Sequence, residues 1–185
     1  VKSWIAYDIG NSAFATTVVA GFFPVFYNQY WANGIDADDA TVYKTLALAI
    51  CNTIVLLTAP LIGAISDINN ATKKFLVLFA TIGALFVGLL SLLSLGSWLY
   101  ALVFFGIANY CFAVGQIPYD KILTKIAPLN KLSQISNQGY AWGYLGGGSL
   151  FLINALMFLY WEQIGLHSSA DAIKISFVMV AIWWL

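Results

Sequence analysis

The sequence predicts an all-α integral membrane protein with six transmembrane helices, of which the sixth is truncated. Hydrophobic residues make up 61% of the 185 residues and charged residues only 9%, whereas soluble domains carry about 25% charged residues. The charged residues are separated by long uncharged runs, and most of these runs reach the roughly 20 residues that a membrane-spanning helix needs. Stretches such as 75–95 are apolar on all sides, unlike the alternating pattern of a membrane β-strand.

The uncharged runs place the helices in order along the chain. These runs cover residues 9–35, 45–66, 75–119, 132–161 and 175–185. The third run holds two helices, which we divide at the turn-like pair Gly96-Ser97. The predicted helices form a single transmembrane domain over residues 1–185 and span about 4–31, 42–66, 74–95, 98–118, 133–161 and 173–185.

The two ends of the chain suggest that it is a piece of a longer protein. The last predicted helix, 173–185, is too short for a hydrocarbon core of about 30 Å. The chain also begins with Val1 rather than Met. We therefore expect further chain beyond this sequence.

Lysine positions predict the orientation, because cytoplasmic loops are enriched in basic residues. With a cytoplasmic N-terminus, the outside segments hold only Lys44 and Lys174. The inside segments then hold the other lysines: Lys2, Lys73, Lys74, Lys121, Lys125 and Lys131. We expect an integral protein of the bacterial inner (cytoplasmic) membrane with the lipid bilayer as its partner. The low charge and zero net charge argue against a nucleic-acid partner.

Cysteine and histidine give no indication of a metal or another cofactor. Cys51 and Cys111 lie in separate predicted helices, where we interpret them as buried apolar residues rather than as a disulfide or a metal pair. His167 is the single histidine and lies in an outer loop without a second ligand nearby. The sequence therefore predicts no metal site and no cofactor.

A polar stripe runs along the first predicted helix. On a helical wheel it consists of Asp8, Asn11, Ser12, Ala15, Val19, Phe22, Phe23 and Phe26. A carboxylate inside a spanning helix is costly and by default indicates a functional site. We predict Asp8 as a possible proton site or gate latch; the alternative is a carboxylate solvated at the interface or paired with a loop lysine.

The end of the second predicted helix carries a recognisable motif. Gly63 precedes Asp67 by four residues, and Lys73 and Lys74 follow. Gly63 permits close helix approach, and Asp67 can accept hydrogen bonds from the first amides of a facing helix. The pattern resembles motif A of the major facilitator superfamily, which implies a gating role for these four residues. Residues 68–72 intervene here and arginine is missing, and the alternative is an ordinary helix end with cytoplasmic positive charge.

Glycines recur along the fifth predicted helix at Gly139, Gly143 and Gly147. Small residues at four-residue spacing let helix backbones touch, so these glycines predict close helix packing. The spacing also resembles antiporter motif C of the same superfamily, although Tyr144 replaces its proline. Packing is the interpretation that we favour.

Together these segments resemble the vacuole effluxer branch of that superfamily, the autophagy-linked amino-acid exporters and their bacterial permease relatives. The similar segments, in chain order, are 4–14, 63–67, 119–123 and 136–147. The resemblance implies the N-terminal half of a two-half fold, built from 3+3 inverted repeats, with substrate near the membrane midplane. It implies a missing C-terminal half or a second copy as partner, and a cavity lined by the first and fourth helices.

Candidate solute-binding residues follow from this resemblance. They are Asn11, Thr16, Asn52 and Asn109, whose side chains can hydrogen-bond a solute or, equally, a neighbouring helix. With no lysine or arginine at mid-depth, a neutral, zwitterionic or cationic solute suits the site, and amino acids are favoured. Secondary active transport coupled to protons and facilitative transport both stay open as mechanisms of alternating access.

Two other classes of membrane protein fit the sequence less well than a transporter. An intramembrane protease needs paired groups within hydrogen-bond reach, and no such pair occurs around Asp8 or Ser149, so we predict no enzyme and no catalytic residues. A non-transporting membrane assembly or lipid-handling protein is the alternative that remains. A second set of six spans would favour the transporter.

Overall fold

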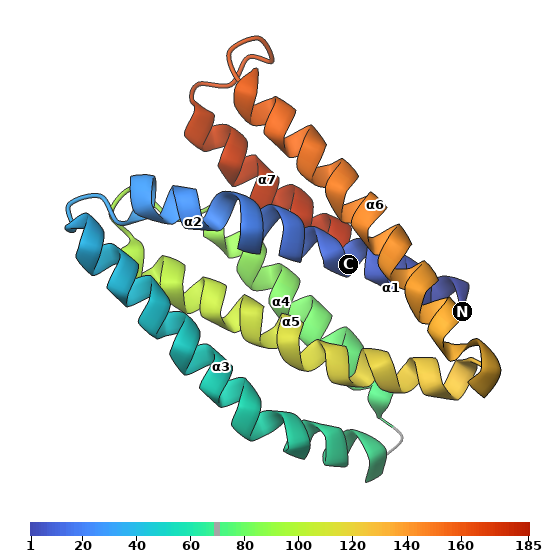
Figure 1. The fold of residues 1–185 in the computed structure, drawn as a ribbon. Coiled ribbons are helices and arrows are strands. Elements are labelled where there is room, and N and C mark those ends of the chain that lie inside the picture. Colours follow the sequence, from blue (N-terminus) through green and yellow to red (C-terminus); the bar gives the residue numbers. More distant parts are fainter. Residues whose placement is uncertain (69–70) are drawn as a thin grey trace.

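The protein is an all-helical bundle, seen in a computed structural model that describes residues 1–68 and 71–185, with only the backbone of residues 67 and 68 (Figure 1). The first helix runs continuously over Lys2–Trp31. It consists of α1 (Lys2–Ala13), the π-helix η1 (Phe14–Phe22), the short α2 (Phe23–Phe26) and the π-helix η2 (Tyr27–Trp31). The remaining elements are α3 (Ala37–Ile68), α4 (Thr72–Leu90), α5 (Trp98–Ile126), the 3-10 turn η3 (Leu129–Lys131), α6 (Leu132–Leu159) and α7 (Ser169–Trp184).

Five helices among the described residues are long and apolar enough, by length and composition, to cross a membrane. They are the first helix, α3, α4, α5 and α6 with its preceding turn. The sixth element, α7, has 16 residues. Their length, order and apolar composition make the chain an all-α integral membrane protein.

Some helix ends differ from the sequence-based expectation. Helix α3 begins at Ala37 rather than at residue 42, because Asp38 and Asp39 occupy its first turn, where acidic side chains stabilise a helix N-terminus. Helix α5 continues through Pro118 to Ile126 instead of ending at residue 118. A proline inside a helix removes one hydrogen bond but need not end the helix.

Helix pairs pack in a pattern that repeats between the two halves of the bundle. The first helix packs along α6, and α3 packs along α5, while α4 and α7 lie against each other. Helix α4 also packs on α5, as α7 does on the first helix. The first helix, α3 and α4 correspond in order to α5, α6 and α7. If each helix is replaced by its counterpart, the same pairs of helices are in contact. Two three-helix repeats produce this arrangement.

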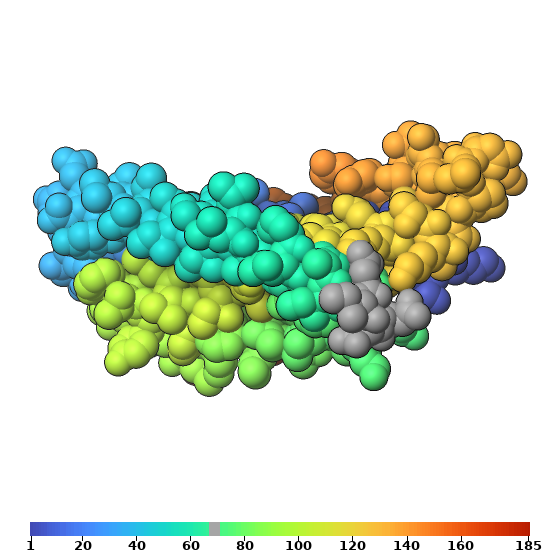
Figure 2. All heavy atoms as spheres, turned by 90° about the horizontal axis from the view of Figure 1, so that it is seen from below, coloured from blue at the N-terminus to red at the C-terminus, as the bar shows by residue number. Residues whose placement is uncertain are grey.

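The main core lies around the first helix rather than around α3. Aromatic side chains dominate it, with Phe23 stacked on Phe105 at 3.7 Å between ring centroids and Trp31 stacked on Phe177 at 5.6 Å. Most of α3 stays exposed. Helices α3 and α6 flank one face of the bundle, and Figure 2 shows that face hollowed between them.

Candidate functional site

A polar cavity of about 330 Å³ opens between the first helix, α5 and α6. The first helix contributes most of the polar side chains, α5 adds a carboxamide and a carboxylate, and α6 adds two phenol rings. The lining residues are Asp8, Asn11, Ser12, Ala15, Thr16, Phe112, Gln116, Asp120, Tyr140 and Tyr144. We call this space the polar cavity.

The first helix brings its polar side chains together because of their spacing. Asp8, Asn11, Ser12 and Ala15 stand at positions i, i+3, i+4 and i+7, which share one face of a helix. Asp8 is 6% exposed and Asn11 is 3% exposed. The Asn11 Oδ1 atom is buried and has no hydrogen-bond partner among the described residues. A buried polar atom without a partner is costly, so Asn11 is a candidate for contact with a ligand.

Glycines on α6 allow the first helix to approach closely beside the polar cavity. A Cβ atom added to Gly143 would lie 2.6 Å from Ser12 Oγ and 2.9 Å from Asp8 Oδ2. At Gly147 the added atom would lie 2.9 Å from the backbone carbonyl carbon and oxygen of Ser12. The glycines therefore hold the polar face of the first helix directly against α6.

Gly139 belongs to the same contact, one turn nearer the N-terminus. A Cβ atom there would lie 2.5 Å from the Trp4 ring. That ring stacks on Tyr119 at 4.3 Å between centroids, and Trp4 Nε1 donates a hydrogen bond of 2.9 Å to the Tyr119 carbonyl oxygen. Trp4, one helical turn before Asp8 in the first helix, thus packs against both α5 and α6.

Thr16, a predicted solute ligand, lines the polar cavity but directs its hydroxyl to the backbone. Thr16 Oγ1 lies 3.0 Å from the Ser12 carbonyl oxygen and 3.1 Å from the Gly147 carbonyl oxygen, to which it can donate. The Thr16 hydroxyl therefore donates to backbone oxygens of the first helix or of α6. One residue further on, the Thr17 hydroxyl is buried without a partner among the described residues. Both threonines lie in the π-helix η1, a type of helix that is often found at functional sites.

The other two predicted solute ligands lie away from the polar cavity. Asn109 Nδ2 lies 3.6 Å from the Cys51 sulfur, so its side chain points from α5 toward α3. Asn52 is exposed on α3 and does not line the polar cavity.

Sequence reasoning missed four polar residues that line the polar cavity: Gln116, Asp120, Tyr140 and Tyr144. Each pair stands four residues apart on its helix, so the spacing could have placed the two members of each pair on one face.

The predicted gate residues lie at the far end of α3. The Gly63 carbonyl oxygen accepts a hydrogen bond of 2.6 Å from Lys121 Nζ, which also lies 3.4 Å from Ser66 Oγ. Lys73 and Lys74 are exposed at the start of α4, and the side chain of Asp67 lies outside the described residues. Lys121 of α5 therefore contacts the C-terminal part of α3, and its positive charge offsets the negative end of the α3 helix dipole.

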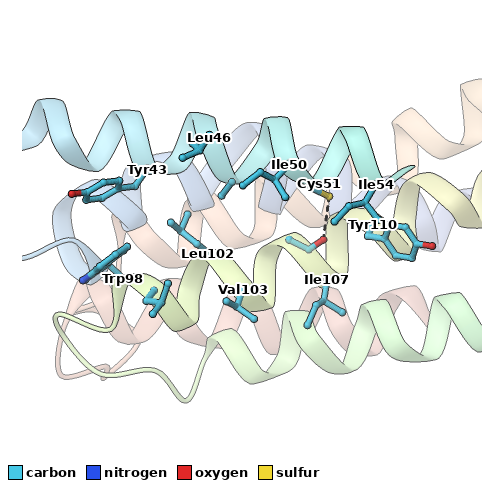
Figure 3. A pocket seen from close by; sticks show the side chains of 13 residues that line it. Tyr43, Leu46, Ile50, Cys51, Ile54, Trp98, Leu102, Val103, Ile107 and Tyr110 are labelled. Carbon is cyan, nitrogen blue, oxygen red and sulfur yellow. Dashed lines mark hydrogen bonds between the residues drawn. The ribbon is translucent and has the colours of Figure 1, made fainter. Parts of the chain in front are cut away.

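A second cavity of about 520 Å³ lies between α3 and α5 and is lined almost wholly by apolar side chains (Figure 3). We call it the apolar groove. Tyr43 and Trp98 stack at one end, with 5.1 Å between ring centroids. Near its middle the Cys51 thiol donates to the Gly106 carbonyl oxygen at 3.4 Å. Its chemistry suits hydrocarbon rather than a polar solute.

Comparison with known proteins finds two similarities. Residues 38–127 match the family model described as vacuole effluxer Atg22 like. The chain is also 29% identical, over 185 residues, to the uncharacterized MFS-type transporter YxiO of Bacillus subtilis (strain 168). The chain is therefore similar to vacuole effluxer-like proteins and to an MFS-type transporter.

The chain matches this relative over only part of that protein. The match covers 99% of the chain and 43% of the relative, so the chain spans less than half of the relative's length. No solved structure matches it. The first and fourth membrane helices, expected to line the solute cavity, are here the first helix and α5, and both line the polar cavity together with α6.

Proposed function

We propose that this chain forms part of a transporter that moves a small polar solute, with amino acids favoured, across the membrane by alternating access. The observation that carries the proposal is the polar cavity: a group of carboxylate, carboxamide and hydroxyl side chains gathered inside helices that are otherwise apolar. Polar groups at such positions are rare and usually line a solute or ion pathway.

The size and chemistry of the polar cavity support a small solute. Its volume of about 330 Å³ falls at the lower end of the roughly 300–1,000 Å³ typical of small-molecule sites. Asn11 and Gln116 can each donate and accept hydrogen bonds. Asp8 and Asp120 can hold an amino group, and the Asn11 and Gln116 amides can donate to a carboxylate. These groups together match the two ends of an amino acid.

The membrane orientation and the partner belong to the same proposal. The lysines beside the α3–α4 connection, Lys121 and Lys125, support a cytoplasmic position for that end of the bundle, and with it a cytoplasmic N-terminus in a bacterial inner membrane. The hollowed face between α3 and α6 is where we place the second half of the transporter, either a C-terminal half or a second copy. Asp8 is the group that we propose to bind a proton if transport is proton-coupled; facilitative transport is the alternative.

One observation favours a second candidate function. The apolar groove between α3 and α5 could hold an acyl chain, as a lipid-handling or non-transporting membrane protein would need. The similarity to a protein described as an MFS-type transporter supports transport over both catalysis and lipid handling.

Counterflow in proteoliposomes tests the proposal. The natural gene product is reconstituted in bacterial phospholipid vesicles loaded with a mixture of unlabelled amino acids, and uptake of each radiolabelled amino acid is followed. We expect transient accumulation of at least one amino acid above empty vesicles and above the Asn11→Ala variant. Absence of counterflow, together with rapid exchange of labelled lipid between the leaflets, would favour the lipid-handling candidate instead.

A further inference from the structure

Resting on the transporter proposal, we infer that the polar cavity binds the cationic group of a net positively charged organic solute between Asp8 and Asp120. Two carboxylates, one from the first helix and one from α5, line this single space. No lysine, arginine or histidine lines the polar cavity among the described residues.

The nearest lysine along the chain does not supply the missing charge. Lys121 follows Asp120, but its Nζ atom is hydrogen-bonded to the carbonyl oxygen of Gly63, at 2.6 Å, at the end of α3. Two like charges in a space of reduced dielectric repel each other strongly. A bound cation removes that repulsion, so the polar cavity favours a solute that carries net positive charge.

Asn11 provides a second and independent observation. Its side chain is 3% exposed and lines the polar cavity, and its Oδ1 atom is buried without a hydrogen-bond partner among the described residues. An amide oxygen accepts hydrogen bonds only, as does an ionised carboxylate. Asp8 and Asp120 therefore present acceptors to one space, and the Asn11 amide oxygen adds an acceptor without a partner beside them. An ammonium or guanidinium group, which only donates, complements these acceptors.

Aromatic rings that line the polar cavity favour an organic cation over a metal ion. Phe112 on α5 and Tyr140 and Tyr144 on α6 line the same space. The two tyrosines are 60% and 73% exposed, so their rings are open to an incoming solute. Aromatic faces attract organic cations. No group of three metal-ligating side chains occurs in the part of the chain that the structure describes.

A matched pair of solutes tests this inference. Arginine and citrulline have nearly the same shape, but arginine carries a guanidinium where citrulline carries a neutral urea group. Using the natural gene product in proteoliposomes, we expect arginine counterflow at least tenfold faster than citrulline counterflow. In detergent solution, we expect calorimetric binding of arginine at least tenfold tighter than binding of citrulline.

Two variants connect the charge preference to the polar cavity. Asp120→Asn should lower arginine counterflow at least tenfold while leaving citrulline counterflow within about twofold of wild type. Asp39→Asn, at an exposed position in the first turn of α3, removes an equal charge outside the polar cavity and should change neither rate. If Asp120→Asn fails to elute as a monodisperse species, Asp120→Glu serves in its place and should keep the preference for arginine.

The outcomes separate this inference from the transporter proposal. Equal transport of arginine and citrulline would overturn the cation preference and leave the transporter proposal standing. Tight arginine binding without counterflow of any solute would overturn transport and leave the cation site standing. Neither binding nor counterflow of arginine, with counterflow of neutral amino acids retained, would overturn the inference directly.

Discussion

Substituting Gly147 by alanine should separate the first helix from α6 and destabilise the bundle. A methyl group at Gly147 would lie 2.9 Å from the backbone carbonyl carbon and oxygen of Ser12 and 3.0 Å from Thr16 Oγ1. Backbone atoms cannot rotate away, so one helix must move by several tenths of an ångström. The same movement lengthens the 3.1 Å contact between Thr16 Oγ1 and the Gly147 carbonyl oxygen.

The adjacent glycine provides the matched control. Nothing among the described residues lies within 4 Å of a Cβ atom added to Gly148. Alanine in place of glycine stabilises a helix interior by up to about 1 kcal/mol, and both variants share this gain. Overpacking of a tight contact costs roughly 1–3 kcal/mol and applies to Gly147 alone. We therefore expect Gly147→Ala to be less stable than Gly148→Ala by about 1–3 kcal/mol.

Unfolding by sodium dodecyl sulfate in mixed micelles measures this difference. The natural gene product and the two variants are titrated with the denaturing detergent, and helix content is followed by circular dichroism. The Gly147→Ala midpoint should fall below wild type and the Gly148→Ala midpoint should equal or exceed it. Equal midpoints for the two variants would refute the close approach of the first helix to α6 on which the polar cavity depends.

Three further predictions concern the ends of the bundle. Lys121→Met should lower the free energy of unfolding by about 1 kcal/mol, because it removes a charged donor from the Gly63 carbonyl oxygen; the same titration measures it, and Lys74→Met, at an exposed position, should change little. Trp4→Phe should cost about 1 kcal/mol through loss of the hydrogen bond to Tyr119, and an unchanged midpoint would contradict that contact. A membrane-impermeant thiol reagent outside the cell should label Asp38→Cys but not Lys74→Cys, and the reverse pattern would overturn the proposed orientation.

Helix positions and the polar face of the first helix could be predicted from the sequence because they depend on local patterns. Uncharged runs define the membrane helices, and the spacing of Asp8 and Asn11 places them on one face whatever lies opposite. The glycine spacing on α6 likewise predicts a face that a neighbouring helix can approach closely. Each of these features is encoded within one helix.

The rest of the polar cavity could not be predicted because it depends on how α5 is rotated against its neighbours. Asn109 and Gln116 are both polar residues of a mostly apolar helix, and sequence alone does not say which of them faces α3 and which faces the first helix. Ending the fourth helix at residue 118 also placed Asp120 in a loop, whereas α5 continues to Ile126. The contact of Lys121 with Gly63 joins residues 58 positions apart, and no local pattern predicts it.

Protection of a single cysteine would test most directly whether the polar cavity holds the transported solute. Ala15 lines the polar cavity with a small side chain, and Asn52 is exposed on α3 outside it. In the natural gene product with its own cysteines, including Cys51 and Cys111, replaced by serine, a saturating concentration of a transported amino acid should slow N-ethylmaleimide labelling of Ala15→Cys several-fold and leave labelling of Asn52→Cys unchanged. An Ala15→Cys labelling rate unaffected by the solute would contradict the assignment of the polar cavity as the solute site.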